Sequence, residues 1–173
     1  MIIRIVGAIV IVGACYLYAQ LLSMRLMKRL YVLQDLHKLG RIFKASVRYV
    51  GADIDEVFED IRKKVSEEVS RFLEVVIEEI RNRKVTDISQ VWNKAIEEQL
   101  RDYYLSSEEI SVIKRLGDTI GSLDRQMQIE SADLYLCELG DRINILAEEM
   151  RIKNRLYRSI SIAAGIFIVL LIC

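Results

Sequence analysis

Apolar and charged positions are unevenly distributed along the chain, because two uncharged apolar tracts enclose a charged middle. Residues 5–22 and residues 159–173 contain no Asp, Glu, Lys or Arg. As helices these tracts would reach roughly 27 Å and roughly 22 Å, against a hydrocarbon thickness of about 30 Å. The pattern predicts an N-terminal transmembrane helix over residues 1–24, a helical soluble domain over residues 25–156 and a shorter transmembrane helix over residues 157–173.

In the middle of the chain, apolar residues recur at the spacing of helices. The sequence contains no proline and only 8 glycines, whereas a fold rich in strands needs more of these turn residues. Helix starts are predicted at Asp53, Asp87 and Ser106, and each of these has Glu or Gln three residues later, as in a capping box. The middle is therefore predicted to be a bundle of several helices.

The two outermost helices are predicted to be long and to continue into the apolar tracts. The first is expected to reach about Val50, with a seven-residue repeat formed by Leu26, Leu33, Gly40 and Val47. The second follows a break at Gly121 and Ser122 and carries apolar residues at alternating steps of three and four from Ile129 to Met150. Because both must enter one membrane from the same side, the predicted fold is an all-α antiparallel helical bundle with two membrane-entering helices.

Basic residues gather at the inner end of each apolar tract. Arg25, Lys28 and Arg29 follow the first tract, whereas the outer flanks offer Arg4 alone. Arg151, Lys153, Arg155 and Arg158 precede the second tract. The positive-inside rule then predicts a cytoplasmic middle domain whose basic clusters contact anionic lipid. A cleaved lipoprotein beginning at Cys15 is the disfavoured alternative, because the apolar run continues beyond that residue.

The sequence offers no set of residues typical of catalysis. The 25 basic and 25 acidic residues balance to a net charge of zero, so the basic surface expected of a nucleic-acid-binding protein is absent. A single histidine, His37, cannot supply a nucleophile–base set, and Gly117 and Gly121 lack the lysine and spacing of a phosphate-binding loop. The cysteines Cys15, Cys137 and Cys173 lack metal-ligand spacing. We therefore predict no enzyme activity, cofactor, metal or small-molecule substrate.

Residues 116–128, LGDTIGSLDRQMQ, resemble the LGxxLGxxDxxxQ segment of the stage III sporulation protein AB family. Trp92, which precedes the helix-capping Ser106, agrees with the resemblance, whereas the family's proline after the first long helix is missing here. The candidate family-motif and partner-interaction residues are Leu116, Gly117, Gly121, Asp124 and Gln128. These residues also have a structural interpretation, because the two glycines admit a neighbouring helix, Gly121 suits a left-handed helix end, and Asp124 can cap the following helix.

The resemblance implies a structural subunit of the complex that endospore-forming bacteria build in the mother-cell membrane around the forespore, the outer forespore membrane. Its soluble domain would be cytoplasmic and similar to the F-domain platform proteins of type II secretion and type IV pilus systems. By that analogy its partners are the complex's secretion-type ATPase, stage III sporulation protein AA, the other subunits and membrane lipid. The alternative is a pore-lining or channel-assembly component without direct ATPase docking, which the few polar residues of the tracts, Gln20, Ser159 and Ser161, disfavour.

Overall fold

The computed structural model describes the backbone of residues 2–49, 53–82, 87–120 and 124–172. Regular structure over these residues is helical and includes no strand, which confirms the all-α prediction. The helices are α1 (Ile2–Tyr49), α2 (Ile54–Arg62), α3 (Glu67–Arg81), α4 (Ile88–Gln99), the 3-10 helix η1 (Arg101–Tyr103), α5 (Ser107–Ile120) and α6 (Arg125–Ile172).

The chain divides into two compact units. One consists of residues 29–144, and the other combines residues 1–28 with residues 145–173. The middle domain predicted from the sequence, residues 25–156, is slightly longer than the unit of residues 29–144. Its limits stay a prediction.

The unit formed by both chain ends consists of the N-terminal part of α1 and the C-terminal part of α6. Among its described side chains, Leu17 and Leu156 are exposed, whereas Leu146 and Met150 are buried. Within the described residues, we find no helix with the length and apolar character needed to cross a membrane. Most side chains of the two uncharged tracts lie outside the described residues.

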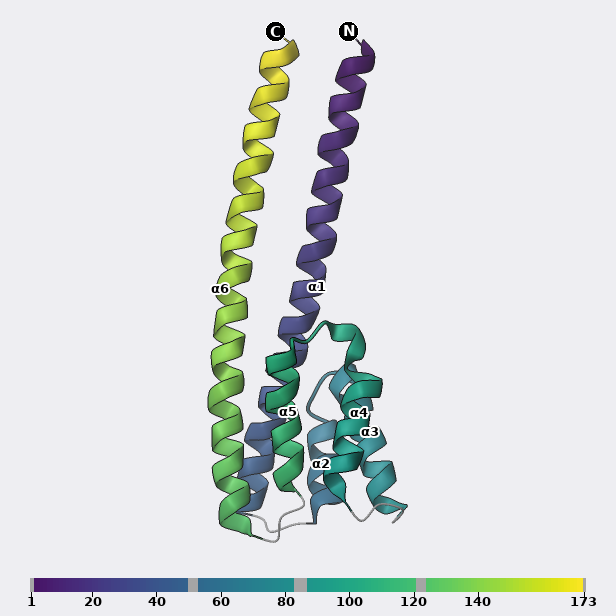
Figure 1. Cartoon of the computed structure of the whole chain (residues 1–173), viewed down its shortest axis with the longest axis vertical. Coiled ribbons are helices and arrows are strands. Elements are labelled where there is room, and N and C mark those ends of the chain that lie inside the picture. Colours follow the sequence, from purple (N-terminus) through teal and green to yellow (C-terminus); the bar gives the residue numbers. More distant parts are fainter. Residues whose placement is uncertain (1, 50–52, 83–86, 121–123, 173) are drawn as a thin grey trace. The chain divides into compact units, whose positions relative to one another are not determined.

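The unit of residues 29–144 is an up-and-down helical bundle. The second half of α1, the helices α2 to α5 and the first part of α6 alternate in direction along the chain (Figure 1). Packing is sequential, with α2 against α3, α3 against α4, and α4 against α5. The antiparallel bundle predicted for the middle of the chain is confirmed for this unit.

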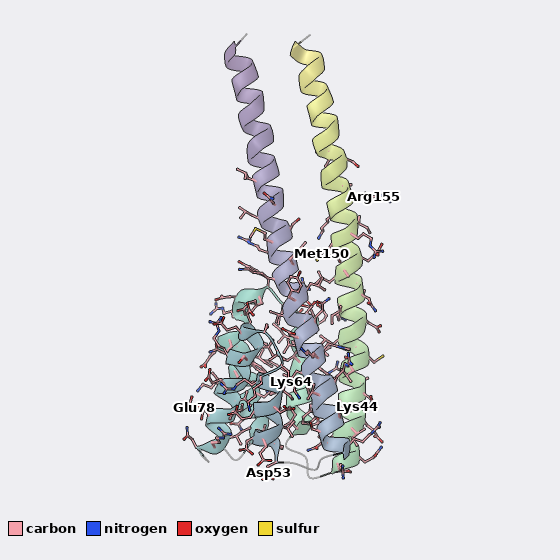
Figure 2. All side chains as sticks on the ribbon, turned by 180° about the vertical axis from the view of Figure 1, so that it is seen from behind. Lys44, Asp53, Lys64, Glu78, Met150 and Arg155 are labelled. Carbon is pink, nitrogen blue, oxygen red and sulfur yellow. The ribbon has the colours of Figure 1, made fainter. Side chains whose placement is uncertain are left out.

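Within this bundle α1 and α6 pack antiparallel. Lys44 of α1 forms an ion pair with Asp133 of α6 (Figure 2). The buried hydroxyl of Tyr135 donates a hydrogen bond of 2.8 Å to the Leu36 carbonyl oxygen, and its ring lies over Gly40. A Cβ atom at Gly40 would lie 2.4 Å from Cε1 of Tyr135, so α6 approaches α1 closely at the predicted seam glycine.

Four aromatic side chains connect the inner faces of α1 to α4. The ring of Phe43 stacks on Phe58 with centroids 6.3 Å apart, and Phe58 lies 5.8 Å from Trp92. Phe72 meets Trp92 edge-on at 4.8 Å. All four are almost completely buried, and edge-to-face or offset pairs of this kind add to the stabilisation from burial. The hydrophobic core is therefore centred on Trp92.

The predicted helix starts have different outcomes. Asp87 caps α4, because its carboxylate accepts a hydrogen bond of 2.9 Å from the Ser89 amide. Asp53 stands at the N-cap position of α2, but its side chain makes no capping bond, so the predicted capping box there is wrong. Ser66 is the N-cap position of α3 and likewise makes no side-chain capping bond. The predicted breaks at Gly51, Gly121 and Ser122 lie outside the described residues.

The tight contact at Gly40 makes a stability prediction. Gly40→Ala should lower the free energy of unfolding by about 1–3 kcal/mol, because the new methyl group overlaps the Tyr135 ring and α6 must shift. The matched control is Gly140→Ala on α6, where the nearest atom, Nε2 of His37, lies at an ordinary 3.7 Å. That variant should be as stable as the wild type or gain up to about 1 kcal/mol from helix propensity. Urea titrations of the full chain in detergent measure both, and equal stability of the two variants would contradict the proposed packing.

Candidate functional site

A buried ion pair ties the start of α5 to α1. The Glu109 side chain is 2% exposed. The Arg29 guanidinium donates from Nε to one carboxylate oxygen of Glu109 (2.9 Å) and from Nη2 to the other (2.8 Å). This two-point geometry is the strong form of a charge-assisted hydrogen bond. It joins residues 80 positions apart in the sequence.

The same carboxylate completes the capping box predicted at Ser106. The Ser106 amide donates to Glu109 at 2.7 Å, and the Glu109 amide donates back to the Ser106 hydroxyl at 3.3 Å. Two otherwise unpaired amides at the start of α5 are thus satisfied. The preceding turn holds Tyr104 in the left-handed region, with φ of 57°, a conformation that costs a non-glycine residue about 1 kcal/mol or more. Glu109 therefore fixes both the start of α5 and its position against α1.

The first half of the candidate motif lies inside the bundle. Leu116 is fully buried, and Gly117 faces the indole of Trp92 so closely that a Cβ atom would lie 2.2 Å from Cδ1. One turn earlier, the Ile113 carbonyl oxygen accepts a hydrogen bond of 2.9 Å from Nε1 of Trp92. Gly117 therefore allows α5 to lie directly on Trp92, as the structural interpretation of this glycine predicted.

The second half of the motif organises the connection between α5 and α6. Asp124 is exposed and its carboxylate accepts hydrogen bonds from the amides of Gln126 (2.9 Å) and Met127 (3.3 Å), which confirms the predicted cap of α6. Gln128 is buried, and its side-chain amide donates to the Ile120 carbonyl oxygen at the end of α5 (2.9 Å). Gly121 lies outside the described residues.

A shallow cavity of about 210 Å³ lies between α5 and α6 beside the motif. Its wall includes Leu116, Leu134 and the buried Tyr135. At its rim Arg115 forms an ion pair with Glu138, and the Thr119 hydroxyl donates to Ser131 at 2.8 Å. Asp118 is an exposed lining residue. The cavity combines an apolar floor with a charged rim, which suits contact with a protein side chain.

The structure distinguishes between the two interpretations of the motif only in part. Leu116, Gly117 and Gln128 are buried and serve packing, whereas Asp124 is exposed but occupied as a cap. A direct role of these five residues in partner binding stays a prediction. The Arg29–Glu109 pair and Tyr135 were missed by sequence reasoning. In the sequence, Arg29 is one of several basic residues after the first apolar tract, and no local pattern connects it to Glu109.

His37 is half-buried where α1 faces α6. Burial lowers the pKa of His37, the charge of Arg41 lowers it further, and a hydrogen bond with the backbone of Leu136 acts in the opposite direction. Over the described part of the chain, no group of three or more His, Cys, Asp or Glu residues could hold a metal ion. The arrangement around His37 is that of an interior histidine that favours its neutral form.

Comparison with known proteins gives a consistent result. A family model described as stage III sporulation protein AB matches residues 4–173. Among solved structures, the chain is similar to "Stage III sporulation protein AB (SpoIIIAB)", with a TM-score of 0.66 and 18% identity over 72% of this chain and 97% of that chain. At this identity the structural match shows a shared fold. The comparison with curated proteins gives no significant match.

Removing the Glu109 carboxylate should destabilise the bundle. We expect Glu109→Ala to lower the free energy of unfolding by about 2 kcal/mol, because the cap of α5 is lost and Arg29, whose side chain is 22% exposed, loses its partner. Glu98→Ala on α4 removes an exposed carboxylate away from this cap and is the matched control, with an unchanged unfolding midpoint expected. Equal midpoints for the two variants in urea titrations would show that the pair contributes nothing.

The lowered pKa of His37 makes stability depend on pH. The unfolded chain binds a proton at this residue more readily than the folded chain, so protonation favours unfolding as the pH falls through the ordinary histidine pKa near 6.5. Between pH 7.5 and pH 5.5 the wild type should therefore lose more stability than His37→Gln. Thermal unfolding of both proteins across this range measures the difference, and parallel curves would refute it.

Proposed function

The chain belongs to the stage III sporulation protein AB family, and from this membership and the structure we propose that it is a membrane-anchored platform subunit of the sporulation complex between mother cell and forespore. A role in sporulation comes with the family itself. The proposal adds that the bundle of residues 29–144 holds the complex's secretion-type ATPase, stage III sporulation protein AA, at the mother-cell membrane. The match over residues 4–173, which includes both apolar tracts, is the observation that carries it.

The use of polar groups in the bundle supports a scaffold. Among the described residues, the two buried polar side chains are Glu109 and Gln128. Glu109 is occupied by Arg29 and Ser106, and Gln128 holds the end of α5. A catalytic site usually keeps such groups directed into a pocket with a perturbed pKa. Here they fix helix positions, as expected for a protein whose function is to present a surface.

Membrane anchoring is supported by the sequence of the chain ends. The uncharged tracts at residues 5–22 and 159–173 are each preceded or followed, on the side of the charged middle, by clusters of Lys and Arg. Such clusters orient a protein with the intervening domain in the cytoplasm and attract anionic lipid. This topology places the bundle in the compartment where an ATP-hydrolysing partner works.

We assign the docking surface to the rim of the cavity between α5 and α6. The rim combines exposed charges with the partly open apolar floor at Leu116 and Leu134. Interfaces of this kind gain affinity from a small desolvated centre and specificity from the charged surroundings. In the sequence Asp118 follows the buried motif residues Leu116 and Gly117 and lies just before the end of α5. These two residues would thus position Asp118 without themselves contacting the partner.

The docking prediction can be tested by co-purification. The tagged full chain, extracted in mild detergent from cells that also produce the ATPase, should retain it, and Asp118→Lys should reduce the retained amount by about tenfold. Glu78→Lys on α3 makes the same change of charge at an exposed position away from the rim and should bind like the wild type (Figure 2). Absence of the ATPase from the wild-type sample would refute docking, and equal retention by both variants would refute this surface.

A further inference from the structure

The part of α1 inside the bundle presents an exposed stripe of basic character. Its exposed positions recur at alternating steps of three and four residues, which places them in one line along the helix. We call this line the α1 stripe, and it consists of Tyr31, Gln34, Lys38, Arg41, Ala45 and Arg48. Three of these six residues carry a positive charge and none carries a negative charge.

The corresponding part of α6 presents an exposed stripe of opposite character. We call it the α6 stripe, and it consists of Glu130, Leu134, Cys137, Asp141 and Asn144, again at steps of three and four. Two of its residues are acidic and none is basic. Leu134 leaves 55% of its side chain exposed at the middle of the stripe. One bundle therefore carries two complementary helix faces on different helices.

One pair of opposite charges and one apolar pair match when the two stripes are aligned antiparallel. An alignment that sets Lys38 opposite Asp141 also sets Ala45 opposite Leu134, so that a small residue faces a large apolar one. It differs by only about 3 Å along the helix axis from the alignment inside one chain, in which Lys44 meets Asp133. Two copies whose α1 helices run in the same direction, at nearly the same level along the helix axis, can therefore place their stripes in contact.

We propose that a second copy of this chain docks its α6 stripe on the α1 stripe. The contact is heterologous, because different surfaces of the two copies meet, and each copy keeps one stripe for a further neighbour. Copies related by rotation about an axis along the helices form a closed ring or an open row. The proposal does not depend on the ATPase. Leu134 belongs both to the α6 stripe and to the cavity assigned to the ATPase, so a docked copy and a docked ATPase exclude each other at this residue.

The chemistry of the stripes sets the character of the contact. Exposed ion pairs are screened by salt, and one exposed leucine gives a small apolar centre. The association is therefore weak and sensitive to salt, and it gains strength where copies are held at high local concentration. A lateral contact of this kind suits subunits that assemble side by side.

Disulfide crosslinking of the full chain tests the alignment. The tested variant carries Ala45→Cys and Leu134→Cys, with serine replacing the native cysteines Cys15, Cys137 and Cys173. A disulfide requires Cα atoms within about 7 Å. In detergent at low salt, a mild thiol oxidant should give covalent dimers and a ladder of higher oligomers on non-reducing gels. The control pair Ala45→Cys with Glu98→Cys, whose second position lies on α4, should stay monomeric. A tested pair that also stays monomeric would overturn the proposal.

Charge reversal tests the electrostatic part of the proposal. In the crosslinking variant, Asp141→Lys should lower the yield of oligomers about fivefold, and adding Lys38→Glu should restore it. Because Lys38 also donates to the Lys64 carbonyl oxygen, circular dichroism must show that the double variant is folded. Glu98→Lys gives the same charge change outside both stripes and should leave the yield unchanged. If the crosslinking variant gives the same yield of oligomers with and without Asp141→Lys, the proposed pairing of Lys38 with Asp141 is overturned.

Discussion

The close approach of Gly117 to Trp92 is the contact on which the rest of the bundle depends. Trp92 stands at the centre of the core, with Phe58 and Phe72 on its ring and the Ile113 carbonyl oxygen on its Nε1. A side chain at position 117 would push α5 away from α4, since even a Cβ atom would lie 2.2 Å from the indole. The position of α5 in turn decides where Glu109 stands. The ion pair that secures α1 therefore depends on a glycine about two turns further along the buried face of the same helix.

The fold could be predicted from the sequence as far as local physics determines it. Helix starts at Asp87 and Ser106 depend on residues two or three positions away, and both were found from that spacing. Asp53 shows the limit of such patterns, because it stands at the predicted position without forming the expected bond. The pairs Arg29–Glu109 and Gly117–Trp92 depend on how helices are placed in three dimensions. A single sequence with no proline and many interchangeable apolar residues does not encode those pairings in any short pattern.

The candidate site also combines features that the local sequence predicts with features that depend on how the helices are placed. The sequence marked Leu116, Gly117, Gly121, Asp124 and Gln128 as a set, but a motif alone does not say whether its residues point inward or outward. Their burial and hydrogen bonds show that three of them serve packing and that Asp124 caps α6. A side chain at Gly117 would force the adjacent indole or α5 to shift, whatever the partner. The described motif residues therefore act on packing and on the start of α6, and the proposed docking is assigned to exposed positions that they hold in place.

The distribution of charge also explains why composition gave an incomplete picture of the surface. The net charge of zero is a sum over the whole chain, and it conceals faces of different charge, among them the basic α1 stripe and the acidic α6 stripe. Charges felt by a neighbouring protein act over about one Debye length, close to 8–10 Å, which is the width of a single helix. At that range a partner interacts with the charges of one helix face and not with the net charge of the chain. A chain that is neutral as a whole can thus present differently charged faces to its neighbours, and this separation of charge between helices gives its contacts a direction.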